Sequence, residues 1–422
     1  MLYEHWQAVW RQRPDEMALC DFASGRRWTF SELDQAVARL PSSQEAICFP
    51  HGLSADFVIS VLHAWKIGQV VCPLETSQAV PQLPPRPAGI VHLKTTSATS
   101  GKARMVAMTA SQLKADADNI VQTMGLQPGW PNLGAISLAH SYGFSNLVTP
   151  LLLHGIPLMV LPSPLPEIVR SAAASLPHVT LPAVPAMWRA WNDAGSIPAN
   201  VRLAISAGAP LPIALEQEVL SRSGLKLHNF YGSSECGGIA YDRSSEARTD
   251  AAFVGHAMAN VLLSTNPDGC LEVRGAAVGE TYWPNAETGL GEGCFRTNDL
   301  AQLSKEGVFL RGRLNDQINV AGRKISPEAI ERVLAVHEQV KDCLVFGVPS
   351  QDAGRVEEIV ACVATRNRVT NEVLKQFLLS RLPAWQVPRD WWFVETLGVN
   401  QRGKLSRNEW RKKYLARNGE KA

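Results

Sequence analysis

A segment rich in small hydroxyl residues, Lys94-Thr-Thr-Ser-Ala-Thr-Ser-Gly-Lys-Ala-Arg104, follows an apolar run and contains one glycine and three cations. Hydroxyl groups and backbone N–H groups bind phosphate oxygens, while cations neutralise their charge. The GxxxxGKS/T spacing of a Walker loop is absent, and a segment of this kind taken alone is more often a solvated turn. It predicts a site for nucleotide phosphates only if other motifs accompany it.

A second candidate is the pentapeptide Tyr231-Gly-Ser-Ser-Glu235. Tyr231 offers an aromatic face on which a base can stack, and Glu235 offers a hard oxygen ligand for Mg²⁺ beside phosphates. Taken alone, the same residues would be a tyrosine at a strand end and an exposed glutamate. Upstream, the small residues of Ser206-Ala-Gly-Ala-Pro-Leu211 would let the backbone approach a flat base closely.

Three charged residues in the C-terminal third also have types suited to a nucleotide. Asp299 carries two acceptor oxygens that fit ribose hydroxyls, and Arg313 is a permanent cation that fits ribose and phosphate oxygens. Lys404 lies in the polar loop Gln401-Arg-Gly-Lys404. Without further motifs, the first two would be a surface ion pair worth less than about 1 kcal/mol, and the lysine would be a solvated charge.

The elements that position these residues follow an α/β pattern. From about Ser54, apolar segments of helical length alternate with short strand-like runs, including Gly89–His92, Gly134–Ser137 and Pro157–Leu161. This alternation predicts a largely parallel sheet covered by helices. Beyond about Asp250, the pattern changes to short strands between glycine-rich turns, which predicts a small barrel or an antiparallel layer.

The last quarter of the chain predicts a separate small domain. Ser326 and Pro327 are suited to the N-cap and first turn of a helix, and strands are expected at Cys343–Phe346 and Ile359–Val363. A chain of 422 residues that is 45% hydrophobic can bury two cores. We therefore expect an N-terminal domain over residues 1–313 and a C-terminal domain over 314–422.

Composition excludes several classes of partner. The 41 basic and 39 acidic residues nearly cancel, so no global field attracts nucleic acid or an anionic membrane. The N-terminus lacks the features of a secretory signal, and the longest apolar stretch, near Leu147–Leu161, is interrupted by His154, so we expect a cytoplasmic protein without a membrane span. Eight cysteines without a CxxC pair argue against a zinc knuckle and a disulfide framework.

Five motifs in order resemble those of the ANL superfamily of adenylate-forming enzymes, which includes acyl- and aryl-CoA synthetases, peptide-synthetase adenylation domains and luciferases. Lys94–Arg104 resembles TSGSTGKPKG, Tyr231–Glu235 resembles YGxTE, and Phe295–Asp299 resembles YRTGD. Residues 312–331 resemble GRxDxxIKxxGxRIxPxEIE, and 403–407 resemble GKxxR. The resemblance implies the ANL fold: a large domain with parallel-type sheets and a small barrel-like layer, followed by a small, mobile α+β domain.

The resemblance also implies an ATP site. In such a site Glu235 is on the metal side, Asp299 and Arg313 contact the ribose, and Lys404 stabilises the negative charge that builds between a carboxylate and the α-phosphate. The remaining nucleotide-binding residues implied by the resemblance are Thr96, Ser97, Thr99, Ser100, Gly101 and Lys102 at the phosphates, Gly208, Ala209 and Pro210 at the adenine, and Tyr231, Gly232 and Ser234.

The acid pocket is expected along Ala139–Asn146, with His140, Tyr142, Gly143 and Asn146 as its residues. Relatives that activate amino acids place an aspartate in this segment, and none is present here, which disfavours an α-amino acid. An aryl or other hydrophobic acid is favoured, and a fatty acid stays open. His140 is counted as a catalytic candidate, with a structural histidine as the alternative.

The same family pivots its small domain after adenylation, at a position that is Asn315 here, and presents the loop around Gly322 to a thiol. The acceptor thiol is that of CoA or of the phosphopantetheine arm of an acyl carrier protein; the sequence does not distinguish them. Several positions of the phosphate loop depart from the family pattern, and this predicts weaker ATP binding: Ala98, Ala103, Arg104 and Met105, together with Asn298 before Asp299.

Three functions remain in competition. The favoured one is an ATP- and Mg²⁺-dependent ligase that joins a small-molecule carboxylic acid to a thiol. A second enzyme would pass the adenylate to an amine or a hydroxyl group. The third is a degenerate, non-catalytic protein that binds an acyl group or a nucleotide, which the altered phosphate loop suggests and the retained Glu235, Asp299, Arg313 and Lys404 disfavour.

Overall fold

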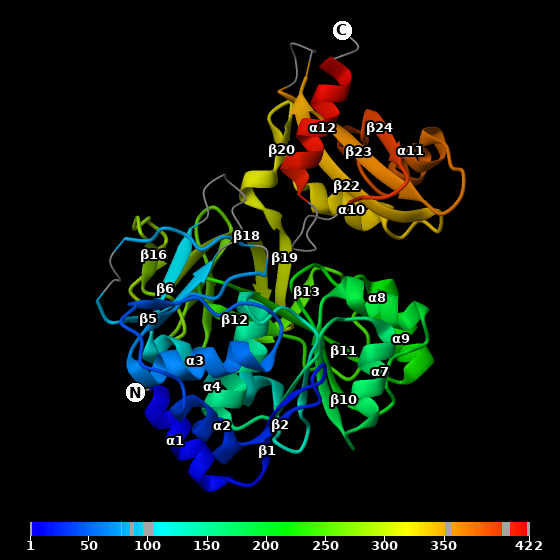
Figure 1. The fold of residues 1–422 in the computed structure, drawn as a ribbon. Helices are drawn as coiled ribbons and strands as arrows, with labels where there is room; N and C mark the ends of the chain where they lie inside the picture. Colours follow the sequence, from blue (N-terminus) through cyan, green and yellow to red (C-terminus); the bar gives the residue numbers. More distant parts are fainter. Residues whose placement is uncertain are drawn as a thin grey trace. The chain divides into compact units, whose positions relative to one another are not determined.

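A computed structural model describes residues 2–76, 78–84, 88–95, 104–350, 356–398 and 406–419. The chain forms two compact units (Figure 1), and each is described by itself below. The larger unit contains residues 1–264, 272–297 and 303–308, and the smaller one contains 265–271, 298–302 and 309–422. The chain passes between the units within strands β14 (Leu262–Thr265), β15 (Cys270–Arg274), β18 (Cys294–Ser304) and β19 (Gly307–Arg313).

A long mixed sheet dominates the larger unit, with a parallel centre. Its strands follow the order β13-β12-β11-β10-β9-β7-β8-β1-β2, in which the neighbours from β11 to β1 are parallel. The outer pairs β1–β2, β11–β12 and β12–β13 are antiparallel. The strands are β1 (Met17–Asp21), β2 (Arg27–Thr29), β7 (Asn132–Gly134), β8 (Leu158–Val160), β9 (Val179–Ala183), β10 (Val201–Ser206), β11 (Leu227–Ser233), β12 (Gly237–Tyr241) and β13 (Phe253–Ala257).

A second sheet of the larger unit has the order β16-β6-β5-β4-β3. Its strands are β3 (Ile47–Cys48), β4 (Val70–Val71), β5 (Ile90–Thr95), β6 (Met105–Thr109) and β16 (Thr281–Trp283). β3, β4 and β5 are parallel, whereas β6 pairs antiparallel with both β5 and β16. The prediction of an α/β fold with largely parallel sheets is therefore confirmed.

One predicted strand is misplaced. The run Gly134–Ser137 was expected to be extended, but β7 begins at Asn132 and ends at Gly134. Beyond it, the Ser137 hydroxyl donates to Glu75 Oε1 at 2.8 Å and accepts from the backbone N–H of Ala139 at 3.3 Å. The bond to Ala139 is a local side-chain bond of the kind that competes with a strand ladder, and the bond to Glu75 is a long-range one.

The helices of the larger unit begin and end at clear local signals. A capping box opens α2 at Thr29 and Glu32, and another opens α4 at Thr109 and Gln112. Gly125, with φ +65°, ends α4 in the left-handed conformation that glycine favours. The main helices are α1 (Leu2–Gln12), α2 (Phe30–Ala38), α3 (Ala55–Ile67), α4 (Ala110–Met124), α6 (Thr149–His154), α7 (Pro166–Ala174), α8 (Pro185–Asp193) and α9 (Ile213–Ser223).

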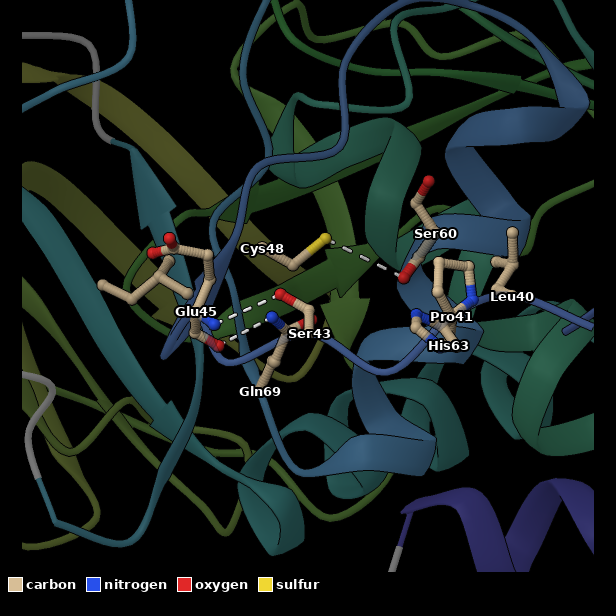
Figure 2. Close-up of a pocket in the computed structure, with 9 residues that line it drawn as sticks. Leu40, Pro41, Ser43, Glu45, Cys48, Ser60, His63 and Gln69 are labelled. Carbon is tan, nitrogen blue, oxygen red and sulfur yellow. Dashed lines mark hydrogen bonds between the residues drawn. The ribbon is translucent and has the colours of Figure 1, made fainter. Parts of the chain in front are cut away.

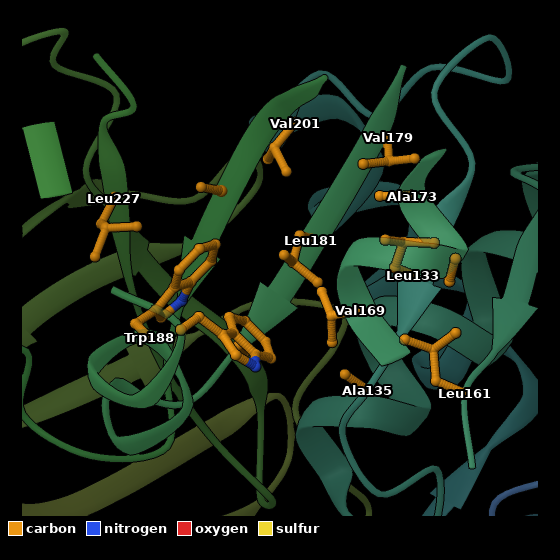
Figure 3. Packing of buried hydrophobic residues seen from close by; sticks show 14 of the residues in the cluster. Leu133, Ala135, Leu161, Val169, Ala173, Val179, Leu181, Trp188, Val201 and Leu227 are labelled. Atoms are coloured by element: carbon orange, nitrogen blue, oxygen red, sulfur yellow. The ribbon is translucent and has the colours of Figure 1, made fainter. Parts of the chain in front are cut away.

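Residues of α7, α8 and α9 pack with those of the parallel strands in one buried hydrophobic core (Figure 3). Trp188 and Trp191 are fully buried, with ring centroids 5.1 Å apart in an edge-to-face arrangement. Each indole N–H finds a backbone acceptor, Ile205 at 3.1 Å and Pro164 at 2.8 Å, which makes the burial of both rings favourable.

The short strands predicted beyond Asp250 are present. The expected runs Gly269–Arg274 and Gly307–Arg311 correspond to β15 and β19, and further short strands are β14 (Leu262–Thr265) and β17 (Leu290–Gly291). β17 pairs antiparallel with β18.

The smaller unit combines a β20–β21 hairpin with the three-stranded sheet β22-β23-β24. Ile330, Leu334, Val345, Ala361 and Leu374 are among its buried core residues. Ser326 is the N-cap of α10 and Pro327 its first residue, as predicted, but the Ser326 hydroxyl donates to Glu328 Oε2 at 2.5 Å and makes no cap bond. The elements are β20 (Ile318–Val320), β21 (Arg323–Ile325), α10 (Pro327–Leu334), β22 (Val340–Pro349), β23 (Glu357–Thr365), α11 (Asn371–Leu379), β24 (Asp390–Val394) and α12 (Arg407–Gly419).

Two further expectations concern the whole chain. Among the described residues, no helix combines the length and the apolar character that crossing a bilayer requires. All eight cysteines lie in described parts of the chain and are free thiols, and most are buried; burial raises the pKa of Cys72, for example, to about 12.

Candidate active site

The predicted adenine-binding residues meet at one edge of the main sheet. β10 and β11 are parallel neighbours, so their carboxyl ends lie at the same edge, where ligands of open α/β sheets bind. Gly208, Ala209 and Pro210 form an exposed turn directly after β10, and Gly208 has φ +84°, which a side chain would strain. Tyr231 is half-buried near the end of β11.

The turn after β11 is tightly built. A Cβ added to Gly232 would lie 2.6 Å from the carbonyl oxygen of Gly237, so no other residue fits where β11 and β12 pair. The turn carries Ser234, whose Oγ accepts a hydrogen bond from Ser141 Oγ at 2.8 Å. Ser141 lies in the predicted acid-binding segment, and Ser234 lies in the predicted nucleotide-binding segment. These two segments, nearly 100 residues apart in the chain, are therefore in direct contact.

Glu235 is held at the same edge by β16. The Tyr282 hydroxyl donates to Glu235 Oε1 at 3.1 Å, and the backbone N–H of Gly279 donates to the carbonyl oxygen of Glu235 at 2.8 Å. Burial and the neighbouring Glu235 charge both raise the pKa of Tyr282, so the phenol stays protonated and remains a donor. The guanidinium of Arg104 lies 4.5 Å from the centre of the Tyr282 ring and pairs with Glu287.

Glu235 suits Mg²⁺ in a particular way. Within the described ranges, no group of three or more His, Cys, Asp or Glu residues could hold a metal alone. Mg²⁺ commonly uses one or two carboxylates and completes its shell with substrate phosphates and water. A single glutamate beside a phosphate site fits that pattern, and Glu235 would hold the ion there.

The predicted acid-binding segment forms a short helix followed by a π-helical turn. His140 is the N-cap of α5 (Ser141–Gly143), which continues into η1 (Phe144–Val148). π-helical turns are rare in proteins overall, and those that occur are often found at functional sites. The Tyr142 hydroxyl lies 3.4 Å from the carbonyl oxygens of Ala183 and Ile205, at the ends of β9 and β10, and burial raises its pKa.

Gly143 and Asn146 have packing roles in this turn. A Cβ on Gly143 would overlap the carbonyl oxygen of Ser137, so only glycine fits. Asn146 is buried, and its Nδ2 donates to the Tyr142 carbonyl at 3.1 Å. Its Oδ1 accepts no hydrogen bond from the described residues. Asn146 thus shapes the segment, with one buried acceptor still unsatisfied.

One inference from the phosphate-loop sequence needs correction. Lys94, counted among the cations of that segment, is buried and does not face solvent where a nucleotide would lie. Its ammonium lies 3.3 Å from Asp116 Oδ2 and 3.3 Å from Ser145 Oγ. A charge buried in the interior is stable only with such partners, and nothing near Lys94 in the sequence indicates them.

The predicted ribose ligands lie in the smaller unit, where Arg313 Nε pairs with Asp299 Oδ1 at 3.0 Å. The side chain of Arg313 is 52% exposed, so a nucleotide can still reach it. Asn315 lies in the 3₁₀ turn η2 (Leu314–Asp316), directly after β19. Gly322 lies in the turn of the β20–β21 hairpin with φ +82°, and its N–H donates to Asn319 Oδ1 at 2.9 Å.

Several predicted residues lie outside the described residues. They are Thr96, Ser97, Thr99, Ser100, Gly101, Lys102 and Lys404. Close to Lys404 in the sequence, Arg407 is described, and its guanidinium contacts Asp316 at 2.7 Å, Glu328 at 2.9 Å and Glu331 at 2.8 Å. Arg407 Nε also donates to the Val345 carbonyl at 2.8 Å. The first residue of α12 is thus fixed to the body of the smaller unit.

A cavity of about 310 Å³ lies elsewhere in the larger unit, beside β3 and α3 (Figure 2). Its lining residues include Ser43, Cys48, His63 and Gln69, and Gln69 Nε2 donates to the Glu45 carbonyl at 2.7 Å. None of the predicted site residues lines this cavity, so it is separate from the sheet edge described above.

Comparison with known proteins identifies the class. The family model for the AMP-binding enzyme matches residues 73–283, half of the chain, and the model for the AMP-binding enzyme C-terminal domain matches 329–404. The chain belongs to the AMP-binding enzyme family, within the ANL superfamily of adenylate-forming enzymes.

Individual relatives are more distant. Feruloyl-CoA synthase of an Amycolatopsis species is 27% identical over 355 residues, 79% of this chain and 72% of that protein. The fatty acid–[acyl-carrier-protein] ligase ScoC of Streptomyces coeruleorubidus is 28% identical over 254 residues, 55% of this chain and 49% of that protein. The crystal structure of ATP-bound MatB from Rhodopseudomonas palustris has the same fold, with a TM-score of 0.86, 19% identity and coverage of 98% of this chain and 99% of that one.

Proposed function

We propose that this protein joins a carboxylic acid to a thiol in two steps at the expense of ATP. In the first, a carboxylate oxygen attacks the α-phosphorus, the bond to the β-phosphate breaks, and pyrophosphate leaves. In the second, a thiolate attacks the acyl carbon and AMP departs with the electron pair of the acyl–oxygen bond. The observation that carries the proposal is the Ser141–Ser234 hydrogen bond, because it joins the segment expected to bind the acid to the segment expected to bind the nucleotide.

Each part of the site has a role in the first step. Tyr231 and the turn at Gly208 would hold the adenine, and Asp299 and Arg313 the ribose. Mg²⁺, bound by Glu235, would neutralise the phosphates, and the Tyr282 hydroxyl would orient the Glu235 carboxylate. Lys404 would stabilise the charge that develops as the carboxylate attacks.

The acid would be aromatic or otherwise hydrophobic. The segment 137–146 contains no carboxylate that could pair with an amino group. Tyr142 packs against Phe230 with ring centroids 5.9 Å apart, which provides apolar surface beside the segment. The likeness to feruloyl-CoA synthase, a protein named for an aryl acid, supports the same choice.

The acceptor would be CoA or the phosphopantetheine arm of an acyl carrier protein. Feruloyl-CoA synthase supports the first and ScoC supports the second. Rotation about Asn315 and presentation of the Gly322 loop to the thiol belong to the proposal. The alternatives are transfer to an amine or hydroxyl, and a protein that binds nucleotide without catalysis.

A pyrophosphate-release assay with a panel of aryl, fatty, dicarboxylic and amino acids tests the proposal. We expect release that depends on ATP, Mg²⁺ and at least one aryl or fatty acid, and a thioester product with CoA or with a carrier protein bearing its arm. The carrier protein without its arm is the control for the second acceptor. An amide or ester product without a thioester would support the second function, and ATP binding without release for any acid would support the third.

A further inference from the structure

A buried ionic cluster connects three segments that the proposed function assigns to the substrates. Lys94 lies near the end of β5, just before the hydroxyl-rich phosphate segment, and its side chain is only 1% exposed. Asp116 lies in α4 and is equally buried. Ser145 lies in η1, within the predicted acid-binding segment. α4 packs against β5, η1 and β12. Groups from these three elements therefore reach the Asp116 carboxylate.

The carboxylate of Asp116 accepts hydrogen bonds from each of these segments. Its Oδ2 lies 3.3 Å from Lys94 Nζ and accepts from Ser145 Oγ at 2.6 Å. Its Oδ1 accepts from the backbone N–H of Gly238, in β12 after Glu235, at 3.2 Å. A Cβ on Gly237, which has φ +69°, would overlap Asp116 Oδ1, so the Glu235 turn closes directly onto this side chain.

We infer that Asp116 is a positioning residue that fixes three parts of the chain relative to one another: the end of β5 that leads into the phosphate segment, the acid-binding turn and the Glu235 turn. A buried ion pair is weak support for stability by itself, because desolvation offsets its attraction, and a register role is its best-attested use. Three donors from three segments of the sequence meet that description. The inference rests on the proposed function, since it assigns the three segments to ATP, acid and metal.

Substitutions separate the contacts that the individual segments make with Asp116, each of which is called an arm of the cluster below. Asp116→Asn keeps an acceptor for the Gly238 N–H but turns an NH₂ group toward the Lys94 ammonium and the Ser145 hydroxyl. Lys94→Met removes the arm at the end of β5. Ser145→Ala removes the arm at the acid-binding turn and also takes one of its two polar partners from the Lys94 ammonium. In the double variant Lys94→Met/Asp116→Asn, the amide can donate to Ser145 Oγ with no cation nearby, which restores the acid arm alone.

The matched control is Lys226→Met, the same exchange in a second buried cluster. Lys226 pairs with Glu216 and with Asp242 Oδ2, the latter at 2.8 Å, and its side chain is 7% exposed. It precedes β11, at the opposite end of that strand from Tyr231. The Lys226→Met substitution should lower the melting temperature without changing a contact of Lys94, Asp116 or Ser145.

The measurements are the KM for ATP, the KM for the acid, kcat and the melting temperature of each variant. We expect Asp116→Asn to raise both KM values about tenfold, because a lost hydrogen bond to a charged group is worth about one order of magnitude. Lys94→Met should raise mainly the KM for ATP. Ser145→Ala should raise mainly the KM for the acid. The double variant should recover the KM for the acid but not that for ATP. Lys226→Met should leave both KM values unchanged.

Two results would overturn the inference. One is KM values that follow the melting temperature in all variants, Lys226→Met included. The other is unchanged KM values in Asp116→Asn and Ser145→Ala despite lower stability. If no acid supports pyrophosphate release, the proposed function fails, and the dissociation constant of ATP measured by calorimetry tests the inference instead. Lys94→Met and Asp116→Asn must then weaken ATP binding while Lys226→Met does not; equal affinities would refute it.

Discussion

The hydroxyl of Tyr282 donates to Glu235 Oε1 at 3.1 Å, so the carboxylate expected to bind Mg²⁺ is oriented by a strand 47 residues further along the chain. The Tyr282 ring lies 4.5 Å from the guanidinium of Arg104, which also pairs with Glu287. A carboxylate held in one orientation presents its remaining lone pairs to the metal in a fixed direction.

Tyr282→Phe should therefore weaken metal use more than folding. We expect kcat/KM for ATP to fall about tenfold and the Mg²⁺ concentration for half-maximal rate to rise, because a bond to a charged group is lost. Pyrophosphate release against Mg²⁺ concentration measures both. Tyr241→Phe is the control, since the buried Tyr241 hydroxyl has no hydrogen-bond partner among the described residues. Equal Mg²⁺ dependence in the two variants would refute the orienting role.

Gly143→Ala should disturb the acid-binding turn. The new methyl group would overlap the Ser137 carbonyl, and overpacking of a close contact costs about 1–3 kcal/mol. We expect a lower melting temperature and a higher KM for the acid than in Gly129→Ala, where a Cβ meets no atom within 4 Å. Thermal unfolding and steady-state kinetics test this, and two variants that behave alike would show that the turn accommodates a side chain.

Arg407→Met should make the stability of the smaller unit depend on pH. Burial raises the pKa of Glu331 above its usual value despite the nearby Arg407 charge. Burial also acts to raise the pKa of Glu328, but Arg407 and the Ser326 hydroxyl together bring that pKa below its usual value. In the native chain these two shifts oppose each other. Without the guanidinium, the folded-state pKa of both carboxyl groups rises, and that of Glu331 moves further above its value in the unfolded chain, so stability is lost as pH increases.

Hydrogen exchange of the β22 and β23 amides measures this effect. Protection in Arg407→Met should fall as pH rises above the usual glutamate pKa of about 4.3, after correction for intrinsic exchange, while the native chain changes less. Arg411→Met is a suitable control because Arg411 Nη2 lies 3.7 Å from a single carboxylate, Glu357, and its side chain is 40% exposed. The same pH dependence in all three proteins would mean that Arg407 does not hold the Glu328 and Glu331 charges in place.

The sequence predicted the parts of the fold that local patterns encode. Alternating apolar segments indicated the α/β architecture, and the positions of Ser326 and Pro327 marked the start of α10. The turns at Gly208 and Tyr231 were singled out by residue types that suit a base and by the family resemblance, and parallel pairing of β10 and β11 brings them to one edge. Their binding of adenine stays a prediction.

Long-range partners were not predictable in this way. From the sequence, Lys94 looks like one of the cations of a phosphate loop. Only the tertiary structure shows that it pairs with Asp116, which lies on another element. Ser141, Ser145 and Tyr282 each find their partners on distant segments, and nothing in their neighbouring residues signals the contact. The end of β7 was misplaced because Ser137 bonds to Glu75, 62 residues earlier.

The most direct test of the central claim is detection of the acyl–AMP ester by mass spectrometry, with ATP, Mg²⁺ and a reactive acid but no thiol. The native chain should accumulate the ester, as should Lys412→Ala, whose lysine lies exposed on α12. Lys404→Ala should form it about a hundredfold more slowly, the scale of losing one preorganised charge contact. Absence of the ester in the native chain for every acid, or unchanged formation in Lys404→Ala, would contradict the account.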